Sequence, residues 1–575
     1  MDAEYDVIVV GSGVAGALCA WQLTQLGHHK ILILEAGDNG TTLGQRIQFH
    51  HTMDVQGNRG DMFAPYKELR SREFAPAPEN AQLELAQQKA GGETYYDYTE
   101  GVDGSKDAFK AGYNRMVGGT TWSWRGNCPR YIPSDFKLKE LYGVGRDWPF
   151  GYEELEPWYC HAERELGVSG NHDELDGLWG GARSQSFPMP GIPWTFSDKK
   201  VADKIQGRTV RGTRINVVTT PQARNSVPYD ARPACEGHSN CIPLCPIQAK
   251  YDATVHLNRL LHTGKVTLKT AAVVIRLELG ADSKIGRVVY RDWKSDDFQQ
   301  ERFVRGKVIV LAAHAIETPK LLLMSGNLAN SSGMVGRNLM DHVQFELIAT
   351  FPEPIYPFRG PQSVTGIEAF RDGAFRSQRS AFRMTIGNDG WGRAGSPATV
   401  IDELAKAGSY GSSLPGAVSS EISRMIRLSF STEMLADAKN RVQLSNKTDP
   451  GMGLPRPMFT FDIGAYVQDG LREGFETAKE LFALMGAQIS PKAKPLEPGG
   501  GARMNWNTAA HIMGTCIMGD KPSESVVNRW GRTHDVDNLW IVGSSVFPTS
   551  ATSNPTLTIA ALALRSGSAI HRALH

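Results

Sequence analysis

The residues that most constrain the fold lie at the start of the chain. Tyr5 to Val10 is β-branched and apolar, as a buried parallel strand should be. Gly11-x-Gly13-x-x-Gly16 follows, then a helical stretch to about Leu26 and a second strand from Ile31 to Leu34 that ends on Glu35. Strand, glycine-rich turn, helix and strand within about 30 residues form one βαβ unit. The sequence therefore predicts an α/β fold with a Rossmann-like nucleotide-binding domain.

Each glycine of this turn has a physical role in binding a dinucleotide. Gly11 permits the tight turn, Gly13 lets backbone N–H groups approach a pyrophosphate, and Gly16 lets the helix pack close to the strand. Glu35 stands where a carboxylate accepts hydrogen bonds from the adenosine ribose. The alternative is a glycine-rich turn in an unrelated α/β fold, but all four elements together favour nucleotide binding. These residues do not distinguish NAD from FAD.

Length and charge limit the classes of protein that the chain can belong to. A chain of 575 residues is too long for one ordinary core, so two large domains are expected. A formal net charge of +1 gives no indication of a nucleic-acid partner. No run reaches the ~18 apolar residues that span a bilayer. The acidic segment Met1 to Asp6 leads directly into a strand, so we expect no export signal in the chain itself.

The order of elements predicts where the two domains lie. We expect strands of a meander at 266–279 and 287–293, then a buried strand at 307–312 and a helix at 317–325. Residues 40–110 are expected to form loops and short elements over the cofactor. From about 346 to 504, long polar loops, alternating strands and one amphipathic helix at roughly 468–485 indicate a separate, inserted domain.

Three of the seven cysteines form the run Cys235-x5-Cys241-x3-Cys245. A small, odd number of cysteines argues against a disulfide framework. Thiolates are soft ligands suited to iron–sulfur clusters or zinc, and three on one loop without a fourth fit a three-iron cluster. The alternatives are a structural zinc with His238 as fourth ligand, or three unconnected thiols. The spacing is unlike the paired C-x2-C of zinc sites.

Several separate segments, in their order and spacing, resemble the glucose–methanol–choline (GMC) flavoprotein oxidoreductases. The resemblance covers both ends of the chain and most of the first 345 residues. It implies the GMC fold, with FAD held non-covalently by a discontinuous domain of residues 1–345 and 505–575, and an α+β substrate-binding domain of residues 346–504. The segments that carry it are Val-Gly-Gly-Thr-Thr-Trp-Ser-Trp at 117–124, the strand and helix at 308–325, Val-Gly-Arg-Asn-Leu-Met-Asp-His at 335–342, His511-Ile-Met-Gly-Thr, the run at 538–549 and Asn554-Pro-Thr-Leu-Thr.

Four further segments, at 118–122, 142–148, 223–230 and 240–247, resemble the FAD subunits of bacterial sugar dehydrogenases for glucose and fructose. The resemblance assigns a [3Fe-4S] cluster to Cys235, Cys241 and Cys245, on a loop of about 225–255. It also implies a small escort subunit that carries the export signal and a multihaem cytochrome c subunit. The expected location is then the periplasmic side of the inner membrane, with the membrane reached only through partners, and otherwise the cytoplasm.

The resemblance also implies catalytic residues. His511 matches the family's base, and a histidine with an unperturbed pKa near ~6.5 is suited to take a hydroxyl proton at neutral pH. Asn554 matches the residue that hydrogen-bonds the substrate hydroxyl beside the base. Asn554-Pro555 is also an ordinary helix start, with Asn as the cap and Pro as the first helical residue. His314, His342 and His534 are expected to be structural.

The residues expected to contact FAD come from the turn, from the family segments and from the last helix start. The chain departs from the wider family at Trp124, where many members have an Asn that touches the flavin, and at Gly543, where an Asp is common. The full set is Gly11, Gly13, Gly16, Glu35, Gly118, Gly119, Thr120, Thr121, Val273, Gly543, Asn554, Pro555 and Thr556.

The function that the sequence favours is an FAD-dependent dehydrogenase. It would oxidise a sugar, polyol or related alcohol by hydride transfer to the flavin, and pass electrons through the cluster to a haem partner subunit or a quinone. One alternative is an oxidase that reduces oxygen directly, with a structural cysteine loop. Another is a redox-silent GMC protein such as a lyase. The alcohol, the carbon oxidised and the electron acceptor cannot be deduced from the sequence.

Overall fold

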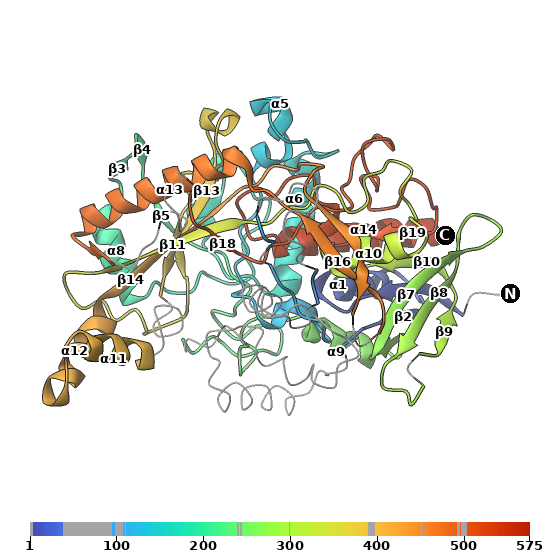
Figure 1. Ribbon diagram of the computed structural model, residues 1–575, viewed down its shortest axis with the longest axis horizontal. Coiled ribbons are helices and arrows are strands. Elements are labelled where there is room, and N and C mark those ends of the chain that lie inside the picture. The colour runs from blue at the N-terminus through green and yellow to red at the C-terminus, as the bar shows by residue number, and fades with distance from the viewer. Residues whose placement is uncertain are drawn as a thin grey trace.

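The computed structural model describes residues 4–37, 95–97, 107–109, 111–237, 241, 244–297, 299–388, 397–449, 452–490, 495 and 503–575. The segment expected to cover the cofactor, residues 40–110, therefore lies outside the described residues except for 95–97 and 107–109. Figure 1 shows an elongated molecule in which the elements that begin and end the chain lie together at one end. Across the described residues, no helix is both long enough and apolar enough to cross a membrane.

A five-stranded parallel sheet forms the first half of the molecule. The order across it is β19-β10-β1-β2-β6, so the first two strands of the chain lie at its centre. Val7, Ile8 and Val9 are fully buried, as a strand covered on both faces requires. The strands are β1 (Tyr5–Val10), β2 (Ile31–Leu34), β6 (Val266–Lys269), β10 (Gly306–Leu311) and β19 (Leu539–Ile541). The predicted α/β, Rossmann-like fold is confirmed.

The helices around this sheet come from both ends of the chain. Helix α1 (Val14–Leu26) packs against α14 (Thr556–Leu574), the last helix (Figure 1). Gln22 of α1 donates to Ser568 Oγ of α14 at 2.9 Å, which joins residues 546 positions apart. The other helices of this half are α5 (Leu138–Tyr142), α6 (Tyr152–Leu166), α7 (His172–Leu175), α9 (Thr254–His262) and α10 (His314–Met324).

The meander prediction is partly wrong. Residues 266–279 form two strands, because Ala271 adopts a left-handed conformation at φ 55° and turns the chain between them. The first part, β6, joins the parallel sheet, and only the second begins the antiparallel meander. A continuous apolar pattern cannot locate such a break. The meander consists of β7 (Ala272–Leu279), β8 (Ile285–Asp292) and β9 (Glu301–Val304).

A seven-stranded antiparallel sheet forms the second half (Figure 1). Helix α13 (Gly464–Met485) packs along it, and begins four residues before the predicted helix at 468–485. Strand β5 comes from before residue 345 and β18 from after residue 504, so this sheet draws on three parts of the chain. Its strands are β5 (Val217–Thr219), β11 (Val343–Thr350), β12 (Thr365–Ile367), β13 (Phe382–Gly387), β14 (Met425–Thr432), β17 (Gln488–Ile489) and β18 (Asn507–Thr508). The proposed domain boundaries stay predictions.

Smaller elements complete the described structure. Two helices, α11 and α12, pack on each other at the far end of the second half (Figure 1). The remaining bounds are α8 (Phe196–Ile205), α11 (Pro397–Lys406), α12 (Leu414–Arg424), β3 (Thr209–Val210), β4 (Thr213–Arg214), β15 (Arg441–Thr448) and β16 (Pro455–Thr460).

Candidate active site

The glycine-rich turn has the geometry of a dinucleotide site. Gly11 has φ 103°, and a Cβ there would lie 2.5 Å from the carbonyl oxygen of Ala312. A Cβ at Gly16 would lie 2.1 Å from the carbonyl oxygen of Gly11, so the close packing of α1 on this turn requires glycine. At Gly13, which precedes α1, an added Cβ would meet nothing within 4 Å. The helix N-terminus therefore faces open space that an anionic group can enter.

Glu35 lies at the end of β2, beside the same turn. Its carboxylate accepts hydrogen bonds from Ser12 N at 3.0 Å, from Ser12 Oγ at 2.6 Å and from Gly37 N at 2.8 Å. Burial raises the pKa of Glu35, and the hydrogen bonds from Ser12 and Gly37 oppose that rise. An ionised carboxylate has about four acceptor sites, so one remains for a ribose hydroxyl.

Other expected cofactor residues meet around this turn. Gly118 N donates to Ser12 Oγ at 3.2 Å, and a Cβ on Gly119 would lie 3.2 Å from Gly13 Cα. The Thr120 and Thr121 hydroxyls hold this segment through Asn114 N, Gly118 O and Ala253 N. A Cβ on Gly543 would lie 3.6 Å from Ala15 Cβ in α1. Val273 packs with Ala36 beside Glu35. The fold therefore gathers one set of residues that fits FAD, from five separate segments.

His511 and Asn554 form the second part of the site. Asn554 Nδ2 lies 3.1 Å from His511 Nε2. His511 and Asn554 are partly exposed, whereas residues 512–518 and 550–553 around them are buried. A base and a hydrogen-bonding amide thus lie side by side.

His342, which the sequence predicted to be structural, and Asp341, to which it assigned no role, hold His511 in place. His342 Nδ1 lies 2.8 Å from His511 Nδ1, with the two rings edge to face. Asp341 accepts a hydrogen bond from His511 N at 2.8 Å and another from the Thr508 hydroxyl. Burial raises the pKa of Asp341 to about 7. Asp341 and His342 immediately precede β11. Strand β18 pairs with β11 and is followed along the chain by His511, so the paired strands bring the three residues together. The only feature of the sequence that could have indicated these two residues is their position in the family segment at 335–342.

The surroundings of His342 determine which nitrogen of His511 carries a proton. His342 Nε2 lies 3.0 Å from the carbonyl oxygens of both Ser550 and Ala551, and these can only accept. Burial lowers the pKa of His342 to about 4, so the ring is neutral, with its proton on Nε2 and a lone pair on Nδ1. His511 Nδ1 must then donate to that lone pair. The remaining nitrogen, His511 Nε2, then carries no proton and accepts a hydrogen bond from Asn554 Nδ2.

Asn554 does not cap the last helix. Helix α14 begins at Thr556, and the Pro555 carbonyl accepts the first helical hydrogen bond, from Ile559 N at 2.9 Å. No side-chain cap bonds to this helix start, so the prediction of Asn554 as the cap is wrong. The Asn554 amide is directed at His511 instead, and the helix N-terminus adds its positive end to the same region.

The cysteine loop lies against a buried arginine. Cys241 and Cys245 are buried and Cys235 is partly exposed, and none of the three is in a disulfide. Arg224 Nη1 donates to Cys241 Sγ at 3.1 Å. Burial raises the pKa of Cys235, while the charge of Arg224 lowers it and the neighbouring Cys241 and Cys245 raise it further. His238, the fourth ligand of the zinc alternative, lies outside the described residues. The donor set fits a soft, thiolate-bound group.

Comparisons with known proteins identify the family of this chain. The GMC oxidoreductase family models match residues 217–344 and 436–563, and a model of FAD dependent oxidoreductases matches residues 6–92. The chain is 34% identical to the fructose dehydrogenase large subunit of Gluconobacter japonicus, over 98% of this chain and 97% of that one. It is 26% identical to the 2-methyl-1,2-propanediol dehydrogenase of Mycolicibacterium austroafricanum, over 99% and 95% of the two chains.

A solved structure shows the same fold. Pyridoxine 4-oxidase from Mesorbium loti superposes with a TM-score of 0.60 at 19% identity, over 99% of both chains. At that identity the likeness concerns the fold alone. Together with the sequence matches, it shows that this chain is an FAD-dependent oxidoreductase acting on CH–OH groups and that it belongs to the GMC oxidoreductase family.

Proposed function

We propose that the chain is a dehydrogenase for a sugar, polyol or related alcohol that sends its electrons through a [3Fe-4S] cluster to a partner. The observation that carries the first part is the unprotonated His511 Nε2, which accepts a hydrogen bond from the Asn554 amide, at two residues that are both partly exposed. An alcohol oxygen bound between them meets one proton acceptor and one hydrogen-bonding amide. The fructose dehydrogenase relative supports a sugar or polyol as the substrate.

In this proposal each residue of the site has a separate role. His511 Nε2 takes the hydroxyl proton, and Asn554 orients the same oxygen. Bound FAD supplies the acceptor for the hydride from the carbinol carbon. Asp341 and His342 hold His511 from its backbone and from its Nδ1 side. FAD would be held by the turn of Gly11, Gly13 and Gly16, with Glu35, 118–121, Val273, Gly543 and 554–556 around it.

Cys235, Cys241 and Cys245 would hold the cluster, which supplies a one-electron path. Their spacing, burial and contact with Arg224 support this proposal. The loop of about 225–255 is the proposed docking surface, because a relay is useful only if it ends near the surface. Cys235 is partly exposed, and Val227 on the same loop is 44% exposed.

The partners follow from the same reasoning. A relative named as a large subunit supports an assembly with further subunits. The proposal includes a multihaem cytochrome c subunit, or a quinone, as acceptor, and a small escort subunit. Export with that escort would place the chain on the periplasmic side of the membrane, tied to it only through partners.

One experiment tests the electron path. The protein is purified anaerobically, and its iron, acid-labile sulfide and electron paramagnetic resonance spectrum are measured. An oxidised three-iron cluster has an unpaired spin, whereas zinc is silent. We expect iron and sulfide together with flavin. Flavin without either would overturn the cluster, and stoichiometric peroxide with oxygen as the preferred acceptor would make the chain an oxidase. As a matched variant, Cys241→Ser should keep flavin reduction and lose transfer to a haem partner.

A further inference from the structure

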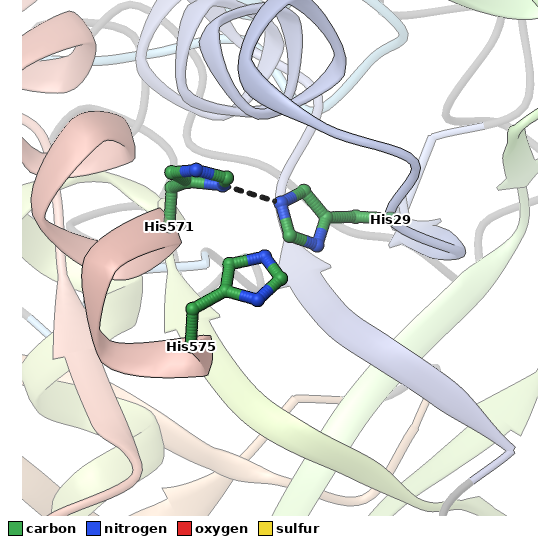
Figure 2. Close-up of side chains that lie close together, drawn as sticks. All are labelled: His29, His571 and His575. Atoms are coloured by element: carbon green, nitrogen blue, oxygen red, sulfur yellow. Dashed lines mark hydrogen bonds between the residues drawn. The ribbon is translucent and has the colours of Figure 1, made fainter.

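Three histidines meet at the end of the parallel-sheet half, far from the catalytic pair. His29 lies on the loop between α1 and β2, and His571 and His575 lie one turn apart at the end of α14 (Figure 2). One ligand nitrogen of each lies within 4.8 Å of the others. Among the described residues, no other group of three His, Cys, Asp or Glu side chains is this close.

The local geometry can accommodate a metal ion. His571 lies in the last turn of α14 and His575 directly follows the helix, four residues further on, a spacing that metal sites use. His29 is 5% exposed and comes from a different element, so three imidazoles converge from two directions. His29 Nε2 and His571 Nδ1 lie 2.9 Å apart. Tetrahedral zinc would hold two such nitrogens roughly 3.3 Å apart, so a small movement suffices.

Gly27 lies close to two of the three rings. A Cβ at Gly27 would lie 3.0 Å from His29 Nε2 and 3.2 Å from His571 Cε1, so a larger side chain there would push the rings from these positions. Asp6 and Lys307, whose charges act on His29, form an ion pair with each other at 2.7 Å.

We propose that His29, His571 and His575 bind one late divalent transition-metal ion, with Zn²⁺ as the reference ion, at a structural site that clips the end of α14 to the βαβ unit. Three imidazoles with little net charge around them select zinc, nickel or copper over magnesium or calcium, which prefer oxygen ligands. The fourth position is left for water.

The site is structural because of its distance from the chemistry. Helix α14 has 19 residues and is therefore about 28 Å long, with Asn554 before its first turn and His571 in its last. The ion would hold α14 against α1 and the loop after it. Metal binding should accordingly raise the stability of the protein and leave the rate of flavin reduction unchanged.

The test is calorimetric titration of Zn²⁺ into the full-length, FAD-loaded protein freed of metal by dialysis. His571→Ala and His575→Ala are compared with His28→Ala, an exposed histidine next to His29 that is outside the cluster. We expect wild type and His28→Ala to bind one equivalent of Zn²⁺. In both cluster variants the affinity for Zn²⁺ should fall at least ~10- to 100-fold, because even the loss of a residue that only supports a ligand reduces metal affinity by that factor. Zinc bound by the cysteine loop would be bound equally by wild type and by all variants, which distinguishes it from zinc bound by the three histidines.

Two further readouts complete the test. The thermal midpoint should rise with Zn²⁺ in wild type and His28→Ala but not in His571→Ala, and Mg²⁺ should have no effect. Retained FAD and wild-type flavin reduction in the variants show that they are folded. Equal zinc affinity in wild type, His571→Ala and His575→Ala, or no binding in wild type, would overturn the site and leave three hydrogen-bonded histidines.

Discussion

His342 and His511 lie 169 positions apart, and the contact between their Nδ1 atoms decides what His511 can do. A histidine is a useful base only if its free nitrogen faces the substrate, and neither residue alone fixes that. Two backbone carbonyls next to His342 fix its proton, and His342 in turn fixes the proton of His511. Chemistry at this site therefore depends on a chain of hydrogen bonds that starts from main-chain atoms at 550 and 551.

Replacing the base tests its role directly. His511→Ala should slow flavin reduction by an alcohol substrate by roughly 10²-fold or more, because the hydroxyl proton loses its acceptor, while FAD stays bound. Anaerobic stopped-flow spectroscopy measures the rate, and absorbance measures flavin content. The exposed His262→Ala serves as control and should behave as wild type. A wild-type rate in His511→Ala would mean that His511 is not the base.

The pH profile reports the surroundings of the same residue. Burial, His342 and then Arg125 lower the pKa of His511 well below its ordinary value near ~6.5. A depressed pKa keeps the neutral, basic form as the solution becomes more acidic. The acid limb of kcat/KM should therefore lie below pH ~6.5. An acid limb centred above that value would contradict this assignment.

Variants of His342 separate tautomer control from packing. His342→Leu fills the space but offers no acceptor, so His511 can place its proton on Nε2, and flavin reduction should slow at least ~10-fold with little change in substrate affinity. His342→Gln supplies an amide oxygen to His511 and an N–H to the carbonyls, and should retain most of the rate. Equal rates of flavin reduction in His342→Leu and His342→Gln would mean that His342 acts only by packing.

At the scale of elements, the close packing of α13 on the second sheet sets the tolerance for side-chain volume. Gly474 lies on the face of α13 that meets β14, and a Cβ there would lie 2.6 Å from the Phe430 ring. Phe430 is fully buried, with Phe345 and Phe382 at ring distances of 5.9 Å. The close approach of α13 to β14 at this point explains why position 474 is a glycine.

Adding one methyl group should therefore be costly at this contact. Gly474→Ala should destabilise the protein by about 1–3 kcal/mol, because overpacking outweighs the gain in helix propensity. The control is Gly416→Ala in α12, where an added Cβ meets nothing within 4 Å and where a neutral or slightly stabilising effect is expected. Urea denaturation of both variants measures the difference. Equal stability of the two would show that the contact is loose.

At the scale of the whole molecule, a buried ion network joins the two halves. Arg376 is fully buried, and its Nη2 lies 2.9 Å from Asp135 and 2.6 Å from Glu433. Asp135 lies before α5 in the first part of the chain, and Glu433 follows β14 of the second sheet. Glu433 also accepts from the Tyr466 hydroxyl at 2.8 Å. The network links segments that no local sequence pattern connects.

Removing the arginine would leave two buried carboxylates without their counter-charge. Arg376→Ala should destabilise the protein by about 3–5 kcal/mol, measured by urea denaturation of the FAD-loaded protein. The control is Lys406→Ala, which breaks an exposed pair with Asp402 on α11 and should cost at most about 0.5 kcal/mol. A small effect in Arg376→Ala would mean that the carboxylates become protonated or hydrated at little cost.

Local patterns in the sequence were sufficient for the α/β fold and for the elements that define its first βαβ unit. The βαβ unit, the strand at 307–312 and the helix near 468–485 follow from periodicity and glycine placement, which act over a few residues. The same patterns did not reveal the break at Ala271 or the start of α14 at Thr556, because both are settled by a single backbone conformation.

The sequence by itself was enough to single out the residues proposed to carry the chemistry, since His511, Asn554 and the glycine turn lie in segments that resemble a known family. Only the tertiary structure decided how they act. It placed His342 against His511, turned Asn554 from a helix cap to a partner of the base, and brought His29 to His571. These are contacts between residues tens to hundreds of positions apart, and their geometry is set by the packing of whole elements, which no local pattern encodes.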